Sequence, residues 1–179
     1  MSNTPCPEML RIAGIQQDSI VDGPGIRCVI FTQGCPHRCP GCHNPQTHDP
    51  EGGREADVQE ILTQIAGNPL ASGVTFSGGE PFVQAKALVP VAEGVKKMGK
   101  HLMIYTGYLY EQLANSHEPE VQRLLMLADV LVDGPFMMEE RDLTLPYRGS
   151  ANQRVIDLEK TRERGEVVLF RSEYEDLSF

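Results

Sequence analysis

The sequence predicts an α/β fold, either a partial (β/α) barrel or a curved, mostly parallel sheet. Short apolar runs suited to buried strands alternate with longer segments that repeat apolar residues at helical spacing. Such alternation implies right-handed βαβ units with parallel strands. The chain has 179 residues, whereas an eight-stranded barrel typically needs about 250. We expect one domain over residues 1–179, with residues 1–9 as a tail and residues 158–179 as a C-terminal extension of unassigned role.

The first half of the chain contains three predicted strands and one helix. Residues 10–15 and 26–33 read as strands separated by the turn-rich run Asp22-Gly23-Pro24-Gly25, which is also typical of a hairpin turn. Apolar residues at helical spacing over residues 58–65 predict an amphipathic helix that ends before Asn68-Pro69. Residues 73–77 then read as a short buried strand.

The second half repeats the alternation less clearly. We expect a helix over residues 84–98 with a kink at Pro90, and a strand over residues 101–105. A helical segment over residues 111–127 is interrupted near residues 117–119, and residues 130–132 form a further buried strand. The chain then departs from the alternation, because the apolar runs 154–158 and 167–170 read as two strands around the charged residues 159–166.

Four loops follow the carboxyl ends of these strands. They are the cysteine-rich run after residue 33, the run Gly78-Gly79-Glu80-Pro81, the pair Thr106-Gly107 and the pair Asp133-Gly134. Ligands in α/β folds gather at the carboxyl ends of parallel strands. We therefore expect the four loops to share one mouth.

Composition restricts the partners of the chain. A net charge of −9 and a pI near 5.0 argue against nucleic acid, which basic surfaces bind, and favour a folded protein or a small molecule. No apolar segment is long enough to span a membrane, and the polar start lacks a signal-peptide core. Five cysteines are an odd count, so we expect a reduced, cytoplasmic protein. We interpret Cys28 as a buried inert thiol and Cys6, in the tail, as a bystander.

Cys35, Cys39 and Cys42 form a C-x3-C-x2-C run within eight positions. Thiolates so close in sequence can converge on one soft metal centre. Two sites suit them: a structural zinc completed by one of the histidines 37, 43 or 48, or an iron-sulfur cluster whose fourth iron is free for a small molecule. The spacing alone does not separate these two hypotheses. Gly78-Gly79, likewise, could form no more than a tight turn.

The combination of C-x3-C-x2-C with Gly78-Gly79-Glu80-Pro81 resembles the radical S-adenosylmethionine superfamily. Within it, residues 22–27 and 42–45 are similar to the signature of glycyl radical enzyme activases. Residues 105–108, 129–136 and 148–154 resemble the activating proteins of anaerobic (class III) ribonucleoside-triphosphate reductases, and the resemblance runs from about residue 12 to residue 157. The pyruvate formate-lyase activases are the nearest rival, and a non-catalytic zinc-stabilised binding module is the alternative from another class.

The chain departs from the family pattern in two places. Gly41 stands where many superfamily members carry an aromatic residue, and residues 158–179 have no match in the family. The pair Pro40-Gly41 is nevertheless similar to the reductase activases.

The resemblance implies that the protein is an enzyme, and it implies which cofactors and partners that enzyme uses. It implies a 4Fe-4S cluster on Cys35, Cys39 and Cys42, with S-adenosylmethionine on the free iron. It implies an external reductant such as flavodoxin and a glycine of the reductase as the recipient of the radical, with no catalytic acid or base assigned. By position, the expected contacts to S-adenosylmethionine are Gly41, Cys42, His43, Gly78, Gly79 and Glu80, with Thr106, Asp133 and Asn152 as weaker candidates.

Overall fold

The computed structural model describes residues 9–171 and contains a single seven-stranded sheet in the order β3-β1-β2-β4-β5-β6-β7. Cys6 and most of the predicted tail lie outside the described residues, as do residues 172–179 of the C-terminal extension. The strands are β1 (Met9–Ser19), β2 (Arg27–Thr32), β3 (Arg54–Asp57), β4 (Gly73–Gly78), β5 (His101–Tyr105), β6 (Val130–Asp133) and β7 (Arg154–Asp157).

The centre of the sheet is parallel and its flanks are antiparallel. Strands β2, β4, β5 and β6 pair in parallel, whereas β1 pairs antiparallel with both β2 and β3, and β7 pairs antiparallel with β6. The predicted α/β class is confirmed, and the sheet is mixed and open, with β3 and β7 at its ends. Because the four central strands point the same way, the loops after them emerge at one edge.

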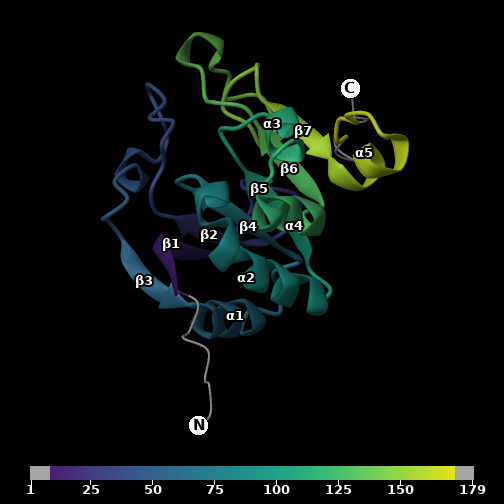
Figure 1. Ribbon diagram of the computed structural model, residues 1–179. Helices are drawn as coiled ribbons and strands as arrows, with labels where there is room; N and C mark the ends of the chain where they lie inside the picture. The colour runs from purple at the N-terminus through teal and green to yellow at the C-terminus, as the bar shows by residue number, and fades with distance from the viewer. Residues whose placement is uncertain (1–8, 172–179) are drawn as a thin grey trace.

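Five helices accompany the sheet in the described part of the chain: α1 (Val58–Ala66), α2 (Ala85–Lys97), α3 (Tyr110–Ala114), α4 (Pro119–Leu127) and α5 (Leu158–Arg164). Figure 1 shows α1, α2 and α4 together along one face of the sheet. Asp57 caps α1 by accepting a hydrogen bond from the Glu60 amide, and Pro119 opens α4, which explains the predicted interruption. Pro90 lies inside α2, which continues through it.

The two faces of the sheet have separate cores. On β5, Leu102 and Ile104 pack among the helices, whereas Met103 belongs to a smaller cluster on the opposite face, with Tyr105 packed against it. This alternation is the two-residue period of a strand. We call the face away from the helices the inner face.

A buried arginine closes the amino-terminal end of the inner face. The Arg27 side chain is fully buried, and its Nε donates to the Thr75 hydroxyl at 2.9 Å. Its other nitrogens lie near the carbonyl oxygens of Pro24 and Val74 and, at 3.1 Å, near His101 Nδ1. Burial lowers the pKa of Arg27 to about 10. The guanidinium thus holds the predicted 22–25 turn under the sheet.

The structure differs from the sequence prediction at three elements. Strand β3 was not predicted, and the charged segment expected to connect two strands begins with helix α5. Residues 167–170 were predicted as a strand but make an isolated bridge, Ile156 to Leu169, with two flanking backbone hydrogen bonds at the edge of β7. Within residues 9–171, every helix is too short or too polar to cross a membrane.

Candidate functional site

A cavity of about 420 Å³ opens at the carboxyl ends of the parallel strands, on the inner face. Phe31, Ser77 and Tyr105 reach it from β2, β4 and β5. The cysteine loop, the glycine loop, Thr106-Gly107 and Gly134 complete its walls, together with side chains from residues 136–153. The prediction that four loops share one mouth is therefore confirmed in this structure.

The cysteine loop leaves β2 and is pinned at its start. The amide of Gly34 donates to the Thr47 carbonyl at 2.8 Å, and the amide of Cys35 donates to the His48 carbonyl at 3.2 Å. The thiols of Cys35, Cys39 and Cys42 are free of disulfides and line the cavity together. Across residues 9–171, no group of three or more His, Cys, Asp or Glu side chains is close enough to form a ready metal site.

The environment of the cysteine loop supplies hydrogen-bond donors to sulfur. Burial raises the pKa of Cys35, and the backbone N–H groups of His37 and Arg38 oppose that rise. The amide of Asn44 donates to Cys42 Sγ at 3.4 Å. Amide donors stabilise thiolate, the form of cysteine that binds metal. The loop therefore favours metal binding once the charge of a bound metal offsets the cost of burying the thiolate.

The glycine loop lies directly against the start of the cysteine loop. Gly78 has a φ of +90°, and a Cβ there would sit 2.8 Å from the backbone of Phe31 and Thr32. A Cβ on Gly79 would collide with the carbonyl oxygen of Gly34. Both positions line the cavity and require glycine, because backbone meets backbone there.

The Gly41 and His43 positions meet the loop that follows β6. A Cβ on Gly41 would collide with Met138 and touch Phe136, and Gly41 is not among the residues that line the cavity. His43 does line the cavity and packs against the Phe136 ring at a centroid distance of 5.0 Å. Side chains from the loop after β6 therefore occupy the space beside Gly41.

The remaining predicted contacts fall into two groups. Thr106 lines the cavity. Glu80, Asp133 and Asn152 are not among its lining residues, and the carboxylates of Glu80 and Asp133 are fully buried. The Asn152 amide donates to the Pro135 carbonyl at 2.8 Å, while its Oδ1 is buried without a hydrogen-bond partner in the described structure.

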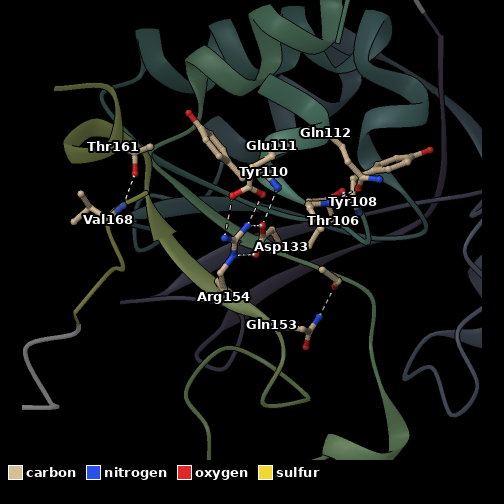
Figure 2. A network of polar contacts seen from close by, with 12 residues as sticks. Thr106, Tyr108, Tyr110, Glu111, Gln112, Asp133, Gln153, Arg154, Thr161 and Val168 are labelled. Carbon is tan, nitrogen blue, oxygen red and sulfur yellow. Dashed lines mark hydrogen bonds and ion pairs between the residues drawn. The ribbon is translucent and has the colours of Figure 1, made fainter. Parts of the chain in front are cut away.

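Asp133 is held by Arg154 of β7. Figure 2 shows Arg154 reaching the carboxylates of both Asp133 and Glu111, the latter at 2.8 Å. The hydrogen bond to Asp133, followed by that to Glu111, raises the pKa of Arg154. Asp133 also accepts the amide of Tyr110 at the start of α3. It joins β6, β7 and α3, a structural role that the sequence did not reveal.

Several lining residues were not predicted. Asp22, Tyr105 and Phe136 line the cavity, and all three lie in motifs already quoted for the family resemblance. His48 and Arg148 also line it, and His48 Nε2 and Arg148 Nε are buried there without a hydrogen-bond partner among residues 9–171. In the sequence, His48 was named only as a possible zinc ligand, and Arg148 lies in the quoted run 148–154.

The three thiols are not assembled into a ready metal site, but their chemistry suits an iron-sulfur cluster with a polar ligand beside it. Three thiols give three soft donors and leave one metal position for another ligand. His48 and Arg148 line the cavity, and each keeps one buried nitrogen without a hydrogen-bond partner among residues 9–171, so the wall beside the thiols is polar.

Comparisons with known proteins agree with this donor set. Residues 21–156 match the family described as "4Fe-4S single cluster domain". The chain is 33% identical over 142 residues to the anaerobic ribonucleoside-triphosphate reductase-activating protein of Haemophilus influenzae, covering 75% of this chain and 89% of that protein. The protein of the same name from Vibrio cholerae is 36% identical over the same shares.

Pyruvate formate-lyase activases are also similar, over a smaller share of their length. The Clostridium pasteurianum enzyme is 43% identical over 108 residues, which cover 57% of this chain and 45% of that enzyme. All of these relatives are named as activating proteins or enzymes, so the alternative of a non-catalytic zinc module is not supported. The chain belongs to the radical S-adenosylmethionine activases that carry a 4Fe-4S single cluster domain, in the family of the anaerobic ribonucleoside-triphosphate reductase-activating proteins.

Proposed function

We propose that this enzyme generates the glycyl radical of an anaerobic ribonucleoside-triphosphate reductase. The proposal rests on the share of each relative's length that this chain covers. The chain spans 89% of the Haemophilus and Vibrio reductase activases, but 45% and 61% of two pyruvate formate-lyase activases. A shared length favours a shared partner, because segments outside the common core are where related enzymes acquire different binding surfaces.

Cys35, Cys39 and Cys42 would hold a 4Fe-4S cluster, and the open sheet would be the partial barrel of a radical S-adenosylmethionine enzyme. The chemistry that these groups would supply when bound is reductive cleavage of S-adenosylmethionine, and the resulting 5'-deoxyadenosyl radical would remove a hydrogen atom from glycine. Flavodoxin or a similar one-electron donor would provide the electron, and the cytoplasm is where we place the reaction.

The protein's own part is to bind, orient and shield the reactants. His43, Gly78 and Gly79 line the cavity and are the proposed contacts to S-adenosylmethionine, together with Cys42. Val21 and Leu143 also line the cavity and are 70% and 69% exposed, so they form an apolar rim. We propose that the glycine-bearing segment of the reductase passes this rim.

The test mixes the anaerobically reconstituted protein, a reductant and S-adenosylmethionine with either the reductase or pyruvate formate-lyase. We expect a glycyl radical signal by electron paramagnetic resonance with the reductase, and none when Cys42→Ser replaces the parent. Iron analysis of the same samples should give about four irons per parent chain. A radical formed on pyruvate formate-lyase alone would refute the proposed partner, and a colourless protein holding one zinc would refute the chemistry.

A further inference from the structure

The Glu80 carboxylate is a fully enclosed acidic group beside the candidate site. Its side chain is 0% exposed. Oε1 accepts the amide of Phe82 at 3.1 Å, Oε2 accepts the amide of Gly107 at 2.9 Å, and the Thr106 hydroxyl lies within 3.0 Å of both oxygens. A buried carboxylate is tolerated only when its oxygens are hydrogen-bonded, so each donor that reaches it matters.

The donor from the cysteine loop is His37, which lies inside the C-x3-C spacing. His37 Nε2 donates to Glu80 Oε2 at 2.8 Å, and the imidazole is 18% exposed. The ring also meets Tyr108 edge to face at a centroid distance of 4.6 Å, and a Cβ on Gly107 would collide with it. His37 is therefore clamped between the glycine loop and the loop after β5.

These contacts connect three loops at one point. The cysteine loop contributes His37, the glycine loop contributes Glu80, and the loop after β5 contributes Thr106 and Gly107. A second connection, the Glu80 amide to the Gly34 carbonyl at 2.8 Å, fixes only the beginning of the cysteine loop. The carboxylate fixes the part that lies between Cys35 and Cys39.

We propose that His37 and Glu80 form a latch that sets the position of the cysteine loop relative to the glycine loop. Both are positioning residues. Glu80 acts through His37 and Thr106, because its oxygens are fully used inside the protein. The inference rests on the proposed function, since the geometry that the latch sets is that of a bound cluster against bound S-adenosylmethionine.

The test compares His37→Ala with His37→Gln, whose side-chain amide can still donate to Glu80 from near the place of Nε2. His117→Ala, at an exposed histidine, is the control. All variants should bind iron like the parent, since the three cysteines remain. In His37→Ala, S-adenosylmethionine should bind about 10–100-fold more weakly, as is typical for the loss of a supporting contact behind a metal ligand. Added S-adenosylmethionine should also change the paramagnetic resonance spectrum of the reduced cluster less in His37→Ala than in the parent.

His37→Gln should restore most of the affinity and of the spectral change. In cluster-free protein, the Gly107 amide should exchange hydrogen faster in His37→Ala than in His117→Ala, a measurement that needs neither cofactor. Unchanged affinity in His37→Ala would overturn the latch. So would Glu80→Gln losing affinity while His37→Ala does not, because Glu80 would then act on the ligand directly. A parent that binds neither iron nor S-adenosylmethionine would instead refute the proposed function, and the inference with it.

Discussion

Acidification from pH 7 to pH 5 should destabilise the cluster-free protein through His101. Burial, followed by the nearby positive charge of Arg27, lowers the pKa of His101 from 6.5 to about 4. Arg27 Nη1 lies 3.1 Å from His101 Nδ1, so the guanidinium donates to a ring nitrogen that must keep its lone pair. Protonation would remove that hydrogen bond and place two cations together under the sheet.

The size of the effect follows from linkage. The folded pKa lies below the unfolded value, so the unfolded chain takes up a proton between about pH 6.5 and pH 4 that the folded protein refuses. The stabilisation is complete above this window and is lost as the pH falls through it. Between pH 7 and pH 5 the loss amounts to about 2 kcal/mol, which solvent screening of the partly exposed ring reduces to about 1 kcal/mol.

Urea denaturation of the reduced, cluster-free protein at a series of pH values measures this loss. His101→Asn is the matched variant, because its Oδ1 can accept from Arg27 in place of Nδ1 and does not titrate. The free energy of unfolding of the parent should fall more steeply below pH 6.5 than that of His101→Asn, by about 1 kcal/mol at pH 5. Parallel curves for the two proteins would refute the reasoning.

Three further variants test the site and its support. Gly79→Ala should lower activase turnover by about 100-fold by displacing the glycine loop, while Gly14→Ala, where a Cβ has nothing within 4 Å, should not; equal turnover would contradict the close approach. Cys42→Ser should lose iron and the brown colour, whereas Cys28→Ala should keep both, and iron analysis decides between them. Arg154→Leu should reduce the free energy of unfolding by about 3 kcal/mol, because it strands the buried carboxylate of β6; an unchanged urea midpoint would show that the ion pair contributes nothing.

Local sequence patterns were enough to predict the strands at the parallel centre of the sheet. The strand predicted over residues 101–105 is β5 to the residue, because a continuous apolar run bounded by polar turns has few other solutions. The shared mouth was also predictable, since it follows from parallel strands and not from any particular side chain. The spacing of the three cysteines was enough to predict that their thiols lie at one site.

Elements that depend on distant partners were missed. Strand β3 buries one residue, Ala56, and exists because it pairs with β1, more than forty positions earlier in the chain. Helix α5 looked like a charged connection, although Asp157 caps it and Gly165 ends it at a φ of +70°, a signal the sequence did contain. The same limit applies to the site. Neither the pairing of Asp133 with Arg154 nor that of Glu80 with His37 can be read from residue types alone.

The walls of the cavity are drawn from residues 21 to 153, and this spread determines when the site can exist during synthesis. The thiols leave the ribosome early, whereas several of the loops that enclose them, up to residue 153, are translated later. Until β6 and the loop after it have folded, the three cysteines of a nascent chain stand open to oxygen and to stray metal ions. Complete enclosure of the thiols therefore depends on the later half of the chain, whose folding shields the earlier half.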